Sequence, residues 1–282
     1  MRGTVRRADI HQHLWPDGFL SSLARRTVQP RLKRGGDGWW LELPGDPPAR
    51  FDPAEHDPAA RLGFERIVVA PSLPLGIEAL PEAEALLDVF HRGILELGPP
   101  FELWASLAGD VDALLDAGAV GVAVAGRDLR DLERIGPALE RLAARGAPLF
   151  VHPGPAAGSP AWFPALTAYV AEMAEAWHAW AAWGRPQFPS LRVVFAMLAG
   201  LAPLHSERLA ARGGPADAVH DALTAFDTSS YGPRAVDAMV RVVGVDRLLY
   251  GSDRPVIAPP GLQALGPAAT HALEVTNPER FL

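Results

Sequence analysis

The stretch ADIHQHLWP, residues 8–16, ends a short apolar run with two histidines one residue apart. In an extended strand alternate side chains point the same way, so His11 and His13 would share one face while Gln12 points to the other. Two imidazoles on one face can bind a metal ion. A lone His-x-His fits two ordinary polar residues at a strand end equally well, so the rest of the chain has to decide.

The alternation of short apolar runs with longer amphipathic ones is typical of βα units around a parallel sheet. Eight runs have the composition of buried parallel strands, at residues 4–10, 65–71, 101–108, 119–126, 148–154, 191–198, 225–232 and 246–253. Helical patterns lie between them at 78–97, 129–145, 161–183, 203–212 and 233–243. We therefore predict one domain over residues 1–282, a single (β/α)8 TIM barrel. A long irregular loop, rich in Gly and Pro, is expected after strand one at about 15–60.

The composition limits the partners and the chemistry. The chain has 282 residues, of which 49% are hydrophobic, and its net charge is −7. An acidic surface offers no counter-charge to nucleic acid or to an anionic membrane, so a small-molecule substrate is expected instead. No stretch reaches ~18 uninterrupted apolar residues and no apolar run follows the basic N-terminus, so we expect a cytoplasmic protein. Cysteine is absent, so any transition metal must be held by histidine and carboxylate groups.

Four side chains with metal-binding chemistry stand at the predicted strand ends. His11 and His13 end strand one, His152 ends strand five and Asp253 ends strand eight. In a barrel of this kind the carboxyl ends of the strands meet at one mouth, and closure places strand eight beside strand one. Three neutral imidazoles and a carboxylate form a ligand set for a divalent ion such as zinc. The sequence therefore predicts one divalent metal at the barrel mouth.

Strand-end motifs run in order through nearly the whole chain, apart from the first long loop: DIHQHLWP, LFVHPGP, FPSLRVVFAMLAG, FDTSSYG, LLYGSDRP and TNPERFL. This ordered set resembles the amidohydrolase superfamily, most of all the branch of aminocarboxymuconate-semialdehyde decarboxylase and related aromatic-acid decarboxylases and hydrolases. The resemblance implies a single catalytic zinc or similar ion on His11, His13, His152 and Asp253. The two-metal branch needs a lysine on strand four, and the run AVGVAVAG has none.

Strand six departs from the pattern of the family. Relatives there read roughly His-Leu-Gly-Gly, whereas this chain reads MLAG and has Met197 in place of the histidine. A thioether cannot accept a proton at neutral pH. Three interpretations stay open: Asp253 serves as both ligand and proton acceptor, His205 at the start of the next helix takes over as the catalytic base, or catalysis is weakened or lost.

Candidate substrate-binding residues also follow strand ends: Trp15, Trp162, Arg127, Arg254, Ser230 and Tyr231. The aromatic rings would form walls of the pocket, and the hydroxyl groups would contact the substrate or support the site. A guanidinium group offers two parallel donors that match a substrate carboxylate. Each of these residues fits an ordinary loop or strand-end position as well.

The leading functional expectation is a metal-dependent hydrolase that uses a metal-activated water on a small cyclic or aromatic acid, lactone, ester or amide. The first alternative is decarboxylation of an aromatic or unsaturated acid at the same site. The second is a non-catalytic homologue, because Met197 replaces the strand-six histidine. Barrels of this type are often dimers, and a homodimer is the corresponding expectation.

Overall fold

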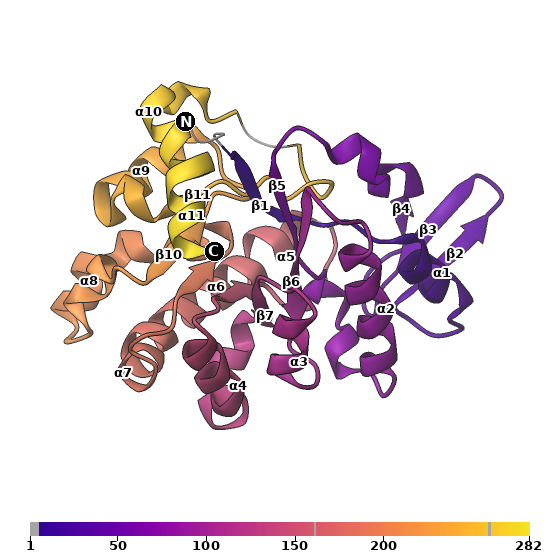
Figure 1. Cartoon of the computed structure of the whole chain (residues 1–282), viewed down its shortest axis with the longest axis horizontal. Coiled ribbons are helices and arrows are strands. Elements are labelled where there is room, and N and C mark those ends of the chain that lie inside the picture. Colours follow the sequence, from indigo (N-terminus) through magenta and orange to yellow (C-terminus); the bar gives the residue numbers. More distant parts are fainter. Residues whose placement is uncertain (1–5, 161, 259–260) are drawn as a thin grey trace.

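Eight parallel strands form a nearly closed barrel in the computed structural model, which describes residues 6–160, 162–258 and 261–282 (Figure 1). In sheet order they are β1 (Ala8–Gln12), β5 (Arg66–Val69), β6 (Phe101–Ser106), β7 (Gly121–Ala125), β8 (Leu149–His152), β9 (Val193–Phe195), β10 (Thr224–Asp227) and β11 (Leu248–Leu249). All eight predicted strands are confirmed, with shorter bounds. Residues 4 and 5 of the first predicted strand lie outside the described residues. The predicted (β/α)8 architecture is therefore correct.

Each predicted helical range contains a helix: α2 (Ala83–Leu95), α4 (Leu132–Arg145), α5 (Trp162–Leu166) together with α6 (Ala168–Ala179), α8 (Ser206–Ala211) and α9 (Pro233–Val243). Outside those ranges lie α3 (Val111–Asp116), α7 (Arg185–Gln187), α10 (Pro267–His271) and α11 (Asn277–Phe281). Helix α4 shows why they form. The Asp131 side chain accepts from the backbone N–H of Arg134 at its start, and Gly146 ends it in the left-handed conformation. The predicted helix at 161–183 divides into α5 and α6, and residue 161 lies outside the described part. No helix that the structure describes is long and apolar enough to cross a membrane.

The barrel interior is closely packed. Every residue of β7 is buried, and Trp104 of β6 stacks on Phe150 of β8 with ring centroids 5.0 Å apart. A Cβ on Gly121 would lie 2.3 Å from the Pro148 carbonyl oxygen and 2.6 Å from Trp104, so only glycine fits there. The interior is thus a filled core, and the polar side chains that could carry chemistry lie at the carboxyl ends of the strands.

The segment after strand one is structured, which corrects the expectation of an irregular loop. It contains α1 (Asp17–Arg25) and an antiparallel sheet of β2 (Arg31–Gly35), β3 (Gly38–Glu42) and β4 (Ala49–Phe51). Its glycines at 35, 36 and 38 form the tight turn between β2 and β3. Figure 1 shows this small sheet beside α1 and α2, at the opposite end of the molecule from α7 and α8.

The seam between β1 and β11 closes the barrel without a regular ladder. A single bridge joins Gln12 to Arg254, and three backbone hydrogen bonds cross the seam. They run from Ile10 N to Tyr250 O at 2.9 Å, from Asp253 N to His11 O at 2.9 Å and from His13 N to Arg254 O at 2.7 Å. Closure therefore places Asp253 beside the two histidines of β1, as the sequence predicts.

Buried His91 makes the stability of this fold depend on pH. Its Nε2 accepts the backbone N–H of Ser106 at 3.0 Å, and burial lowers its pKa to about 4. The unfolded chain takes up this proton near pH 6.5, whereas the folded chain does so only near pH 4, so the free energy of unfolding falls as the pH drops through that interval. When the pH falls from 7 to 5, the free energy of unfolding measured with urea should drop by about 2 kcal/mol more for the wild type than for His91→Gln. An equal drop in the free energy of unfolding of both proteins would contradict the claim that His91 is uncharged in the folded protein.

Candidate metal centre

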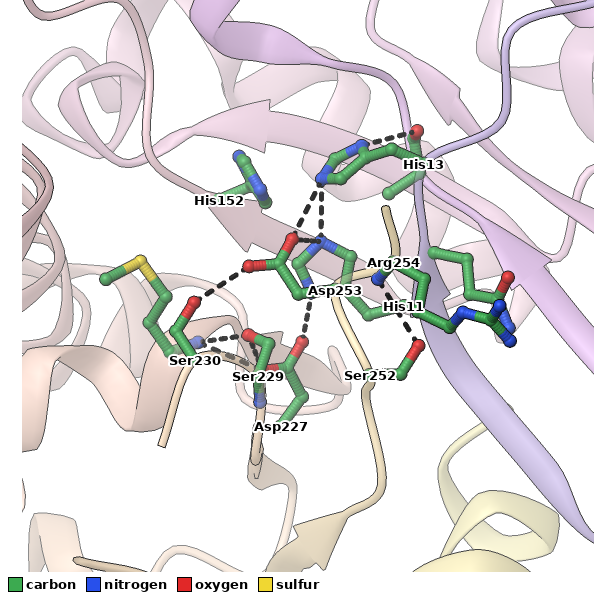
Figure 2. Close-up of polar contacts among 12 residues, drawn as sticks. His11, His13, His152, Asp227, Ser229, Ser230, Ser252, Asp253 and Arg254 are labelled. Atoms are coloured by element: carbon green, nitrogen blue, oxygen red, sulfur yellow. Dashed lines mark hydrogen bonds and ion pairs between the residues drawn. The ribbon is translucent and has the colours of Figure 1, made fainter. Parts of the chain in front are cut away.

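Three histidines from two strands converge at the carboxyl end of the barrel. One ring nitrogen from each of His11, His13 and His152 lies within 4.8 Å of the other two, and all three side chains are buried. The Nε2 atoms of His11 and His13 are 3.1 Å apart. Figure 2 shows the three rings and Asp253 gathered around one point. The structure therefore brings together the four residues that the sequence predicts as ligands.

The second nitrogen of each ring already has a partner that can only accept. The Nδ1 contacts are Asp227 Oδ2 at 2.6 Å for His11, Ala70 O at 3.2 Å for His13 and Pro153 O at 2.8 Å for His152. Each neutral ring therefore has its proton on Nδ1 and directs the Nε2 lone pair inward. Burial, together with the charges of His11 and His13, lowers the pKa of His152 well below its ordinary value, which keeps that ring neutral.

Asp253 supplies the oxygen of the cluster. Its Oδ1 lies 3.4 Å from Nε2 of His13 and 3.8 Å from Nε2 of His11, while its Oδ2 accepts from the Ser230 hydroxyl at 2.8 Å. Burial alone would raise the pKa of Asp253, but the contact with His13 and the surrounding histidines outweigh burial and lower it. The carboxylate is thus ionised at neutral pH.

The donor set fits a divalent cation. Three inward lone pairs and a carboxylate lie closer together than their mutual repulsion favours, and a cation between them converts that repulsion into attraction. Burial opposes a charge on His11, yet the carboxylates of Asp227 and Asp253 outweigh it and raise the pKa of His11, so positive charge is favoured at this point. A divalent metal site is therefore supported here by geometry and by charge.

Asp227, which sequence reasoning did not single out, orients His11. It ends β10 and is fully buried, and its Oδ1 accepts from the backbone N–H of Met197 at 3.0 Å and of Ser229 at 2.9 Å. Gly251 allows this approach, because a Cβ there would lie 2.9 Å from His11 Cβ and 3.1 Å from Asp227 Cγ. The signal available in the sequence was a carboxylate that ends a strand at the predicted mouth.

Met197, which follows β9, the sixth strand of the barrel, contributes a backbone hydrogen bond to the site and no base. Met197 is buried and begins a left-handed turn in which residues 197–201 have φ between 49° and 65°. The backbone N–H of Met197 donates to Asp227, and this hydrogen bond holds the turn against the site. His205 precedes α8, as expected, but it is exposed, and no described hydrogen bond or ion pair joins it to the four ligands. The structure therefore gives no geometric support to His205 as the replacement base.

The two candidate arginines are engaged away from the cluster. Arg127 pairs with Glu172 at 2.7 Å, and Glu172 also accepts from the backbone N–H of Gly154 at 3.0 Å. This pair therefore holds the loop that follows His152. Arg254 points away from the histidines in Figure 2 and donates to the Ala60 carbonyl at 3.3 Å. Both guanidinium groups thus already have acceptors within the protein.

The other substrate candidates divide into supporting and exposed residues. Trp15 is buried, and its indole N–H donates to Ser72 Oγ at 2.9 Å, which in turn lies 3.3 Å from His13 Nδ1. Trp15 thus supports His13 through Ser72. Trp162 is 61% exposed on α5. Ser230 bonds Asp253, and Tyr231, which follows it, is half-buried against the core.

Replacement of Asp227 should weaken metal binding more than it weakens the fold. In Asp227→Asn the amide cannot accept from both His11 and the backbone without presenting an N–H to one of them, so the His11 ring loses its fixed tautomer. We expect the dissociation constant for Zn²⁺, measured by competition with a chromogenic chelator, to rise about 10- to 100-fold. Asp237→Asn, an exposed change on α9, serves as the control and should leave it unaltered. Equal affinity in both variants would contradict the role of Asp227.

Comparisons with known proteins agree with the fold. A family model described as Amidohydrolase matches residues 8–282. Among solved structures, the apo IDCase of Metarhizium anisopliae is 19% identical with a TM-score of 0.75, and the match covers 99% of this chain and 97% of that one. The 5-carboxyvanillate decarboxylase of Sphingomonas paucimobilis is 16% identical with a TM-score of 0.74 and 99% coverage of both chains.

A third structure, the dihydroxybenzoic acid decarboxylase of a Polaromonas species with bound manganese, is 14% identical with a TM-score of 0.66, and the match covers 99% of this chain and 97% of that one. No curated protein matches the chain by sequence at a significant level. The family match covers nearly the whole chain and includes all four candidate ligands. The chain therefore belongs to the amidohydrolase family.

Proposed function

We propose that this protein is a metal-dependent decarboxylase of an aromatic or unsaturated acid. The observation that carries the proposal is the His11, His13, His152 and Asp253 cluster, set at the carboxyl end of a barrel that matches solved aromatic-acid decarboxylases over 99% of the chain. The fold alone does not define a reaction, so the proposal depends on the cluster and the neighbours together.

The metal is proposed from the donor set. When bound, a divalent ion would hold substrate oxygens and stabilise the negative charge that develops on them. Three nitrogens and one oxygen suit zinc, which the sequence predicts, whereas the Polaromonas neighbour holds manganese. Both ions therefore belong in the loading experiments, with the metal content of the purified protein measured first.

The proton is assigned to Asp253. In decarboxylation the bond between the ring carbon and the carboxylate breaks, carbon dioxide leaves, and the electron pair that stays on the ring carbon takes up a proton. Asp253 is ionised, so it can accept a proton from a substrate hydroxyl group and then pass that proton to the ring carbon as carbon dioxide leaves. Ser230 holds the Oδ2 side of the carboxylate during this exchange. Met197 cannot carry the proton, so the proposal routes it through Asp253.

The two other expectations fit less well. Hydrolysis, the leading expectation from the sequence, would use the same ligands, but the three solved neighbours named above include two decarboxylases by name and none described as a hydrolase. A non-catalytic homologue was expected only because of Met197. The substitution removes none of the four candidate ligands, and the backbone of Met197 still bonds Asp227.

Release of carbon dioxide tests the proposal directly. Protein loaded with Zn²⁺ or Mn²⁺ is incubated with 5-carboxyvanillate and with dihydroxybenzoates, and with aryl esters and lactones in parallel. We expect carbon dioxide from at least one acid and a loss of at least about 100-fold in kcat/KM for His13→Ala and for Asp253→Asn. His205→Ala, an exposed histidine outside the cluster, is the matched control and should stay within about twofold of the wild type.

Two results would overturn the proposal. Turnover of esters or lactones without carbon dioxide from any acid would replace decarboxylation by hydrolysis. Stoichiometric metal without turnover of any compound would favour a binding protein.

A further inference from the structure

Strand β1 carries one extra residue at the point where it presents the histidines. Its pairing with β5 shifts between Asp9, opposite Ile67, and Gln12, opposite Val69. Three residues of β1 thus span two of β5, which is the pattern of a β-bulge. The bulge leaves the backbone of Ile10 and His11 out of register with β5.

One backbone donor of the seam has lost its regular acceptor. In a parallel ladder the N–H groups of one strand pair with alternate carbonyls of its neighbour. The Ile10 carbonyl oxygen, which faces this part of the seam, accepts the indole N–H of Trp104 at 2.8 Å. Among the described residues the N–H of Ser252 donates to no backbone carbonyl, so it needs a side-chain acceptor, because an unpaired buried N–H is costly.

The carboxylate of Asp9 is that acceptor. Its Oδ1 lies 3.0 Å from Ser252 N and 3.3 Å from His11 N, and its Oδ2 accepts from Gln12 Nε2 at 2.8 Å. The side chain is fully buried, and none of the described arginines or lysines forms an ion pair with it. Three N–H groups thus donate to this buried carboxyl group.

We propose that Asp9 is a positioning residue that sets the spacing between the histidine pair and Asp253. One oxygen bonds the backbone of His11, on one side of the seam, and of Ser252, the residue before Asp253, on the other. The metal ligands of β1 and of the segment after β11 are thus tied through a single atom. The inference concerns the metal centre of the proposed function, but its test measures metal binding and requires no turnover.

A second contact ties this arrangement to the segment after strand one. Gln12, whose amide nitrogen donates to Asp9, accepts from Arg61 Nη1 at 3.5 Å through its Oε1. Arg61 ends the short 3-10 helix Pro58–Arg61 and is 2% exposed. The orientation of the Gln12 amide is therefore fixed by its neighbours on both sides. An asparagine at position 9 could accept with Oδ1, but its amide group would face the Gln12 amide nitrogen.

Manganese binding distinguishes positioning from general stability. For Asp9→Ala, which loses all three bonds, we expect the dissociation constant for Mn²⁺ by calorimetry to rise about 10- to 100-fold. Asp9→Asn, which keeps the bonds across the seam, should raise it by a smaller factor, so the conservative variant rescues part of the loss. The electron paramagnetic resonance spectrum of the bound Mn²⁺ should also change in Asp9→Ala, because the ligands move relative to one another.

Asp221→Asn is the matched control. Asp221 is likewise a mostly buried carboxylate that binds backbone, accepting from Leu223 N at 3.0 Å, but it precedes β10 at the opposite end of the barrel from the cluster. This variant should lose thermal stability yet keep Mn²⁺ affinity within about twofold. Wild-type affinity and spectrum in Asp9→Ala, or an equal loss of affinity in Asp221→Asn, would overturn the proposal. If Asp9→Ala does not fold, Asp9→Glu decides, because its longer side chain displaces the shared oxygen: Mn²⁺ affinity within about twofold of the wild type overturns the proposal.

Discussion

The mutual repulsion of inward-facing lone pairs is the constraint on which the site depends. His11, His13 and His152 each use Nδ1 to donate to a fixed acceptor, so their Nε2 atoms face one another and the carboxylate of Asp253. Only added positive charge makes such an arrangement favourable. The outer contacts therefore have to hold it in place before a cation arrives, and the barrel provides them from several strands.

These supports come from segments far apart in the sequence. Asp227 of β10 orients His11, and Trp15 reaches His13 through Ser72. The pair of Arg127 and Glu172 fastens the loop after His152 by way of the Gly154 backbone. Each ligand thus has its own support, and the supports lie on different elements. Mutation of such outer contacts commonly lowers metal affinity about 10- to 100-fold.

The sequence predicts the parts of this structure that depend on local pattern. Alternating apolar and amphipathic runs are enough to locate eight strands and most helices, and the rule that strand ends meet at one mouth is enough to group the four ligands. It does not predict Asp227, because its partner lies 216 positions away and its role is set by which way a strand end faces. Arg127 and Arg254 were expected to face a substrate, but the direction of a long side chain depends on neighbours such as Glu172 and Ala60, which no spacing rule reveals.

Diffraction from crystals grown with Zn²⁺ or Mn²⁺, recorded at the absorption edge of the metal, tests the central claim most directly. The account predicts one strong anomalous peak between the four side chains, about 2.0–2.2 Å from a nitrogen of His11, His13 and His152 and from an oxygen of Asp253. The absence of a peak at this position, or a peak that contacts fewer than three of these residues, would contradict it.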